Sequence, residues 1–112
     1  GITMSSESKI AKIMEYGEKK KYAKVVGFLK HKEPELRAAA ADALKNFPTD
    51  ECYNELIILL RDPDLAVQKA AVSSLQAIGR REAVEHLRHE MNTAKDESLK
   101  AACQQAIHAL SN

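Results

Sequence analysis

The sequence predicts an all-α fold, a right-handed α-α superhelix or helical solenoid of about three and a half helical hairpins with seven helices. Three segments carry apolar side chains at the spacing of one helix face. These segments lie 31 and then 32 residues apart, which is a period typical of repeat architectures. Only 4% of the residues are aromatic and Trp is absent, so the core must be aliphatic and rich in Ala, which favours closely packed helices.

Three long helices are predicted over residues 33–47, 64–78 and 96–110. Six apolar positions coincide in them at i, i+3, i+4, i+7, i+8 and i+11, so each segment forms an amphipathic helix. These positions hold, in order, Leu36, Val67 and Leu99; Ala39, Ala70 and Ala102; Ala40, Ala71 and Cys103; Ala43, Ser74 and Ala106; Leu44, Leu75 and Ile107; and Phe47, Ile78 and Leu110. The small residues among them allow neighbouring hairpins to approach at the short end of the ~8–10 Å interaxial range.

The ends of the long helices carry matching signals. Asp64 and Asp96 can cap the first turns, and Glu33 precedes a Pro at the first helical position. Pro48 and Gly79 follow two of the helices, where a helix stops or turns left-handed.

A second, shorter set of helices is predicted over residues 20–30, 50–61 and 81–92, again at a period of 31, with Val25, Leu56 and Leu87 in equivalent positions. An opening helix over 6–16, capped by Ser5 or Ser6, completes the first hairpin. We therefore expect one domain over 4–112, with repeats at approximately 5–32, 33–62 and 63–95 and a final capping helix at 96–110. The polar outer face of that last helix is typical of a terminal cap.

The run from Asp62-Pro63-Asp64 through Val67 to Gly79 resembles a bacterial-style short HEAT repeat, as in the phycobilisome lyase-like HEAT proteins. Residues 33–40 resemble the same unit, and Pro48 departs from it by replacing the closing Gly. The resemblance implies a solenoid whose second helices line a concave face. Such repeats serve many tasks, so the resemblance predicts the fold more specifically than the function.

Charge and cysteine content exclude several function classes. The formal net charge is +1, although residues 1–48 hold ten Lys or Arg against six acids and residues 49–112 hold seven against ten. This balance makes a dedicated nucleic-acid or membrane-surface protein unexpected. Two cysteines do not make a disulfide scaffold, and the sequence shows no signal peptide and no long apolar run, so we expect a cytoplasmic protein. A monomer is the favoured oligomeric state.

One candidate metal site lies on the third short helix, where Glu82, His86 and Glu90 share a face and Glu85 and His89 lie beside them. His89-Glu90 resembles the His-Glu dipeptides that hold the di-iron centre of HEAT-repeat deoxyhypusine hydroxylases. A single such pair does not make a di-iron site, so we expect a solvated helix face with weak i, i+4 pairs, no metal or other cofactor, and no catalysis.

A basic stretch of Lys19 to Lys21 with Lys24, helped by Lys9 and Lys12, could contact phosphates, as in HEAT-like DNA glycosylases. The repeat alignment offers another explanation, because Lys20 lies opposite Glu51 and Lys24 opposite Glu55 on adjacent short helices. Such exposed ladders are common and contribute about 0–1 kcal/mol per pair, so nucleic acid is not the expected partner.

The favoured function is a non-enzymatic protein-binding scaffold or adaptor, with another protein or peptide on the concave face of the short helices. Surplus apolar and aromatic side chains there, led by Tyr22, Tyr53 and Ile58, suggest a docking strip. The alternatives are a relative of the HEAT-type enzymes, phycobilisome lyase-like or metal-dependent, and a nucleic-acid-binding HEAT protein. The candidate partner-binding residues are Tyr22, Tyr53, Ile58, Lys20, Lys24, Glu55, His86 and His89.

Overall fold

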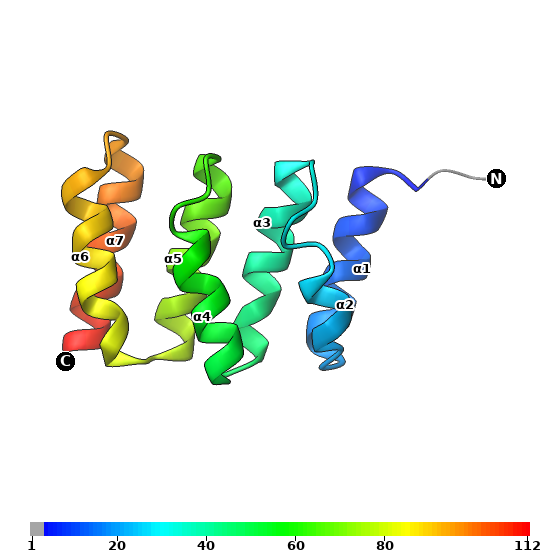
Figure 1. The fold of residues 1–112 in the computed structure, drawn as a ribbon, viewed down its shortest axis with the longest axis horizontal. Coiled ribbons are helices and arrows are strands. Elements are labelled where there is room, and N and C mark those ends of the chain that lie inside the picture. The colour runs from blue at the N-terminus through cyan, green and yellow to red at the C-terminus, as the bar shows by residue number, and fades with distance from the viewer. Residues whose placement is uncertain (1–3) are drawn as a thin grey trace.

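The computed structural model describes residues 4–112, and within that range it contains seven α-helices and no strand (Figure 1). The prediction of an all-α fold is confirmed. The helices are α1 (Ser6–Glu18), α2 (Tyr22–Val26), α3 (Pro34–Ala43), α4 (Asp50–Leu59), α5 (Leu65–Ile78), α6 (Val84–Thr93) and α7 (Glu97–Ser111), and the short 3-10 turns η1 (Leu44–Asn46) and η2 (Arg81–Ala83) adjoin α3 and α6.

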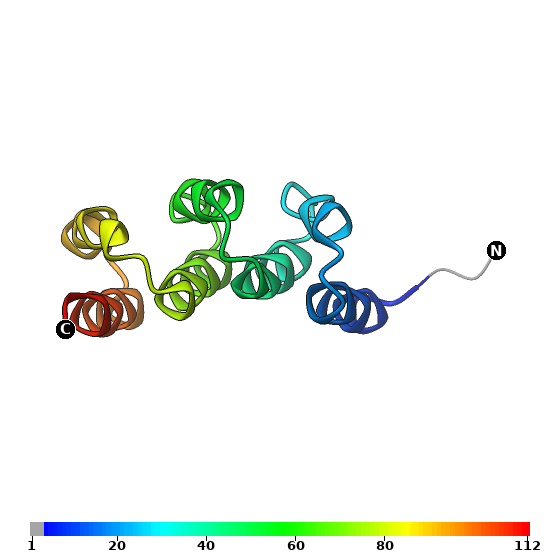
Figure 2. The same ribbon diagram turned by 90° about the horizontal axis from the view of Figure 1, so that it is seen from below.

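The helices form two rows along the long axis of the molecule, which measures 48 × 28 × 17 Å (Figure 2). The long helices α1, α3, α5 and α7 pack directly on one another in sequence, whereas α2, α4 and α6 stand apart as separate ridges. Each of α4 and α6 packs more extensively on the long helix that follows it than on the one before it. The division of the chain into three repeats and a final capping helix stays a prediction.

The spacing of the two rows corrects one expectation. The short-helix face was expected to be concave, but its helices are spaced more widely than the long helices behind them (Figure 2). In a curved array the more widely spaced row lies on the convex side, so the face of the short helices is not concave. The face is therefore ridged, and its hollows lie between helices.

Side-chain caps fix the starts of four helices. The side chains of Ser5, Thr49, Asp64 and Asp96 each accept a hydrogen bond from the backbone N–H three residues later, which satisfies a donor that the first turn would leave free. Gly79 ends α5 with φ of 83°, a left-handed conformation that glycine adopts without steric cost. The cap predictions for Asp64, Asp96 and Gly79 are confirmed.

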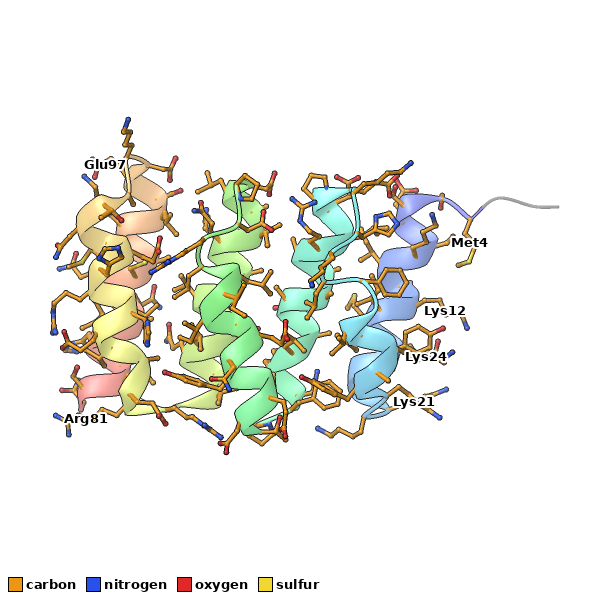
Figure 3. All side chains as sticks on the ribbon, in the orientation of Figure 1. Met4, Lys12, Lys21, Lys24, Arg81 and Glu97 are labelled. Atoms are coloured by element: carbon orange, nitrogen blue, oxygen red, sulfur yellow. The ribbon has the colours of Figure 1, made fainter. Side chains whose placement is uncertain are left out.

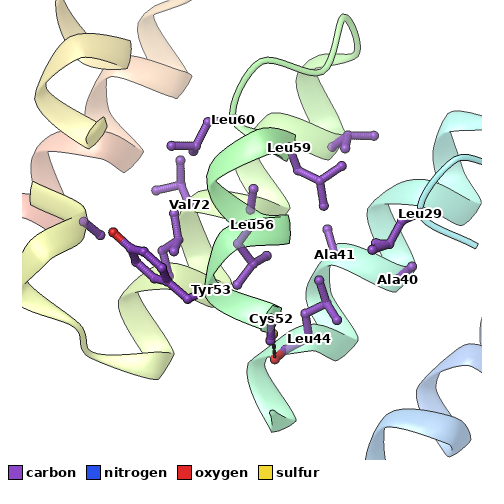
Figure 4. Packing of buried hydrophobic residues seen from close by; sticks show 14 of the residues in the cluster. Leu29, Ala40, Ala41, Leu44, Cys52, Tyr53, Leu56, Leu59, Leu60 and Val72 are labelled. Carbon is purple, nitrogen blue, oxygen red and sulfur yellow. Dashed lines mark hydrogen bonds between the residues drawn. The ribbon is translucent and has the colours of Figure 1, made fainter. Parts of the chain in front are cut away.

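The core is one hydrophobic cluster, mostly aliphatic, and Figure 4 shows the part of it around α4. The stripe positions Ala40, Ala71 and Cys103 are fully buried in all three long helices. Leu56 and Leu87 from the short helices close the cluster from the other side. Burial of such side chains stabilises the fold by about 25 cal/mol per Å² of apolar area, so the stripes provide the main force that holds the rows together.

Two contacts between long helices depend on small residues. A Cβ atom added at Gly17 would lie 3.0 Å from the Cβ of Ala43, so this glycine permits the close approach of α1 to α3. The fully buried Ser74 donates its hydroxyl to the carbonyl of Ala41 at 2.6 Å. This carbonyl belongs to the last turn of α3, where the chain tightens into η1.

The second helix is shorter than predicted. A helix was expected over residues 20–30, but α2 covers only Tyr22–Val26. From there to residue 31 the chain forms tighter turns, in which backbone N–H groups donate to the carbonyl three residues earlier. Gly27, which directly follows α2, is exposed. Glycine weakens a helix interior, which is consistent with the α-helix ending at this point.

Candidate interaction surface

The principal hollow of the described chain lies around the carboxyl-terminal half of α4. It has a volume of about 940 Å³ and is open to solvent. We call it the α4 groove. It is lined by Leu29, Lys30, Arg37, Glu55, Ile57, Ile58, Leu59, Leu60, Arg61, Asp62, Pro63, Glu85, His86, His89 and Glu90.

The groove follows from unequal helix lengths. α2 has five residues, whereas α4 and α6 have ten each. Because α2 ends early, no third helical turn covers the flank of α4, and Leu29 and Lys30 from the following turn line the groove instead. On the other side, α4 and α6 stand apart (Figure 1), and side chains of α6 line the groove there.

An ion pair fixes the wall of the groove on the α3 side. The Arg37 guanidinium donates to both carboxylate oxygens of Asp62 and also to the backbone carbonyls of His31 and Lys32. Asp62 in turn accepts from the N–H of Asp64 at 2.9 Å. The pair is nearly enclosed and its hydrogen-bonding groups are satisfied, so it joins the two interhelical turns rigidly.

Ile58 is the most exposed large apolar side chain in the described part of the chain, at 66%. It lies on the outer ridge of α4 and lines the groove. The equivalent positions one repeat away are Gly27, which does not line the groove, and His89, which does. An exposed branched side chain above a hollow is a common feature of recognition surfaces.

The predicted docking strip is only partly present. Tyr53 is 7% exposed because Arg80, from the turn before α6, covers its ring at 5.1 Å from the centroid, so the prediction that it lies on an exposed strip is wrong. Tyr22 is half-buried, with its ring packed edge-on against Phe47 at 5.1 Å. Of the three leading candidates, Ile58 alone lines the groove.

The lysines of the basic stretch lie outside the groove. Lys20 donates from Nζ to the backbone carbonyl of Asn46 at 2.7 Å and sits over the Phe47 ring. Lys19 pairs with Glu15 at 2.6 Å. Figure 3 shows Lys12, Lys21 and Lys24 along the outer edge of the first two helices, on the side away from α4.

The predicted lysine–glutamate ladder does not form. Within residues 4–112, neither Lys20 with Glu51 nor Lys24 with Glu55 is an ion pair. The separation of α2 from α4 explains the difference, since the ladder needs adjacent short helices in contact. Glu55 instead lines the groove.

The histidines on α6 join Glu55 and Ile58 in the groove. His86 and His89 are exposed and line its α6 wall with Glu85 and Glu90. Among the residues that the structure describes, no three His, Cys, Asp or Glu side chains are placed to hold a metal ion. His86, His89, Glu55 and Ile58 are therefore the predicted site residues that the fold brings together.

The cysteines lie in the core and not at the surface. The Cys52 thiol donates to the carbonyl of Leu44 at 3.0 Å (Figure 4), and both Cys52 and Cys103 are fully buried. Burial raises the pKa of Cys52 to about 12 and that of Cys103 to about 11. Both thiols stay protonated near neutral pH, which disfavours nucleophilic chemistry.

The two-row array of short antiparallel helices, repeated about every 31 residues, defines a helical repeat solenoid. A family model for HEAT repeats matches residues 23–108, and the chain belongs to that family. Comparison with curated proteins gives no match. Within the described residues, no helix has both the length and the apolar character needed to cross a membrane.

Proposed function

We propose that this protein is a non-enzymatic scaffold that binds another protein through the α4 groove. The observation that carries the proposal is the exposed Ile58 above an open hollow of about 940 Å³. HEAT repeats generally act as interaction scaffolds, and the groove is the part of this chain whose shape suits a peptide segment.

The groove has the mixed character of a recognition surface. Its floor and ridge are aliphatic, with Leu29, Ile57 and Leu60 beside Ile58, and charged or polar side chains form its rim. Interfaces place apolar anchors at the centre, where water is excluded, and polar groups around them. The enclosed Arg37–Asp62 pair keeps one wall rigid, so little ordering is needed on binding.

The nucleic-acid alternative is less well supported. Lys12 and Lys19 both pair with Glu15, and Lys20 is bound to a backbone carbonyl. These contacts reduce the positive charge that the stretch offers to phosphate groups. Binding through phosphate contacts would also fall steeply with salt, which separates it from binding through the groove.

A photo-crosslinking amino acid placed at position 58 tests the proposal. We expect a discrete crosslinked protein from a lysate of the source organism, and none from a control with the same group at the exposed Ser73 of α5. The identified protein, once purified, should bind the wild-type chain and lose at least about tenfold in affinity with Ile58→Asp. Unchanged affinity of Ile58→Asp, in a variant that melts like the wild type, would rule out the groove.

A further inference from the structure

The walls of the α4 groove carry opposite charges. On the side of the first hairpin and α3, the charged lining residues are Lys30 and Arg37, both cationic. On the α6 side they are Glu85 and Glu90, with His86 and His89 between them. Glu55 on α4 and Arg61 in the turn after it lie on either side of Ile58 along the chain.

The charged side chains that line the groove differ in whether they are already paired within the protein or free to contact a partner. Arg37 is fully engaged with Asp62, which leaves Lys30 as the exposed cation of its wall. On the opposite wall, Glu85 pairs with Arg88, a residue that does not line the groove, while Glu90 is half-buried. Among the residues that line the groove, Glu90 is therefore the carboxylate of the α6 wall that has no ion pair, opposite Lys30, and the two walls differ in the sign of their charge.

This arrangement selects among possible partner segments. A segment that places a basic side chain over α6 gains attraction from Glu85 and Glu90, whereas an acidic side chain there meets like charges at short range. The reverse holds at Lys30. Juxtaposed like charges are a common means of rejecting wrong partners.

We infer that the partner presents a segment in which a branched apolar side chain lies between a basic end and an acidic end. The apolar side chain contacts Ile58, the basic end lies over the α6 wall, and the acidic end lies over Lys30. The segment runs across the three short helices, along the long axis of the array. This inference rests on the proposed function, because it specifies the chemistry of what the groove binds.

A random displayed peptide library provides an unbiased test. The library is selected on the folded wild-type chain and counter-selected on Ile58→Asp. We expect enriched peptides to carry Lys or Arg on one side of an Ile, Leu or Val and Asp or Glu on the other. Enriched peptides with charge of one sign, or with no charge pattern, would overturn the inference and leave the proposed function intact. Failure to enrich any peptide that distinguishes the wild type from Ile58→Asp would instead contradict the proposed function.

A charge exchange on the α6 wall gives the second arm. Changing Glu85→Lys and Glu90→Lys should weaken an enriched synthetic peptide about tenfold at low salt. A peptide in which acidic residues replace the basic end should bind this double variant about as tightly as the original peptide binds the wild type. The matched control is Glu97→Lys with Glu82→Lys, two exposed acids that do not line the groove, and it should leave the Kd within about twofold. Equal loss in both pairs of variants would show that only net charge matters and would overturn the inference.

Discussion

Arg37 and Asp62 meet in two parallel hydrogen bonds, from Nε to Oδ2 at 3.0 Å and from Nη2 to Oδ1 at 3.1 Å. The side chains are 14% and 9% exposed. The pair links the first turn of α3 to the turn between α4 and α5, and it forms part of the groove wall. One contact therefore serves both the stacking of repeats and the shape of the candidate site.

Replacing Arg37 should be costly because it leaves an enclosed carboxylate without its partner. We expect Arg37→Met, which keeps the aliphatic stem, to lower the free energy of unfolding by about 2–4 kcal/mol. The matched control is Arg61→Met at an exposed position of the same groove, which should change it by less than about 0.5 kcal/mol. Urea denaturation of the two variants measures the difference, and equal midpoints would contradict the structural role of the pair.

Ser74→Ala should destabilise the stack of long helices. The variant loses the 2.6 Å hydrogen bond to the Ala41 carbonyl, which is buried between α3 and α5. We expect a loss of about 1–2 kcal/mol relative to Ser73→Ala, an exposed neighbour in the same helix that gains the same helix propensity. Thermal unfolding of the pair gives the comparison. A Ser74→Ala variant as stable as Ser73→Ala would mean that the hydroxyl contributes nothing.

Overpacking the small-residue stripe should also destabilise the fold. Ala71 is fully buried, so Ala71→Leu forces side chains off their rotamers or moves α5 at a cost of about 1–3 kcal/mol. Ala77→Leu adds the same atoms to an exposed position of α5 and should be nearly neutral. A melting temperature of Ala71→Leu equal to that of the wild type would show that the stripe is not tightly packed.

Lys20 stores backbone strain at the end of α1. Its φ is 59°, a left-handed conformation that costs a residue with a Cβ atom about 1 kcal/mol relative to glycine. The N–H of the next residue, Lys21, reaches back to the Tyr16 carbonyl at 2.8 Å, as in a helix-ending motif that usually has glycine here. Both Lys20→Gly and Lys20→Ala lose the ammonium contact with Asn46, so their difference isolates the strain. We expect Lys20→Gly to be more stable than Lys20→Ala by about 1 kcal/mol in urea denaturation, and the opposite order would contradict the observed backbone.

The buried thiols predict a loss of stability at alkaline pH. The ordinary pKa of 9.0 is raised by burial to about 12 in Cys52 and about 11 in Cys103. Above about pH 9 the unfolded chain releases these protons while the folded chain still holds them, so the free energy of unfolding falls as pH rises toward the folded-state values.

Urea midpoints between about pH 8 and about pH 10.5 measure this dependence. The double variant Cys52→Ala with Cys103→Ala should have a flatter profile. Some slope should remain, because burial also raises the pKa of Tyr22 and of Tyr53. A native protein whose thiols are alkylated as quickly as those of the urea-unfolded chain would contradict the assignment of both cysteines to the core.

The long helices could be predicted from sequence because each one repeats the same local signals. The fully buried positions Ala40, Ala71 and Cys103 were aligned correctly, and Asp64 and Asp96 cap where the pattern indicates. These features depend on side chains within one helix or on the spacing of three similar helices. Periodicity reports such information directly.

The site was harder to predict because it depends on contacts between distant turns. Tyr53 has the pattern of a surplus aromatic, and only the fold brings Arg80 over its ring. Gly17 shows its role only when Ala43 from α3 is placed beside it. The groove itself arises from the early end of α2, which the shared period of 31 residues conceals, since that period predicts short helices of equal length.

An amide chemical-shift titration of the isotopically labelled chain with a peptide that binds it shows directly which surface the peptide contacts. We expect shifts concentrated at residues 29–30, 57–63 and 85–90, with Ile58 among the largest. Ser73 and Ala77, exposed on the long-helix row, should not move. Shifts concentrated on α5 or along the lysines of α1, with residues 57–63 unchanged, would contradict the α4 groove as the recognition surface.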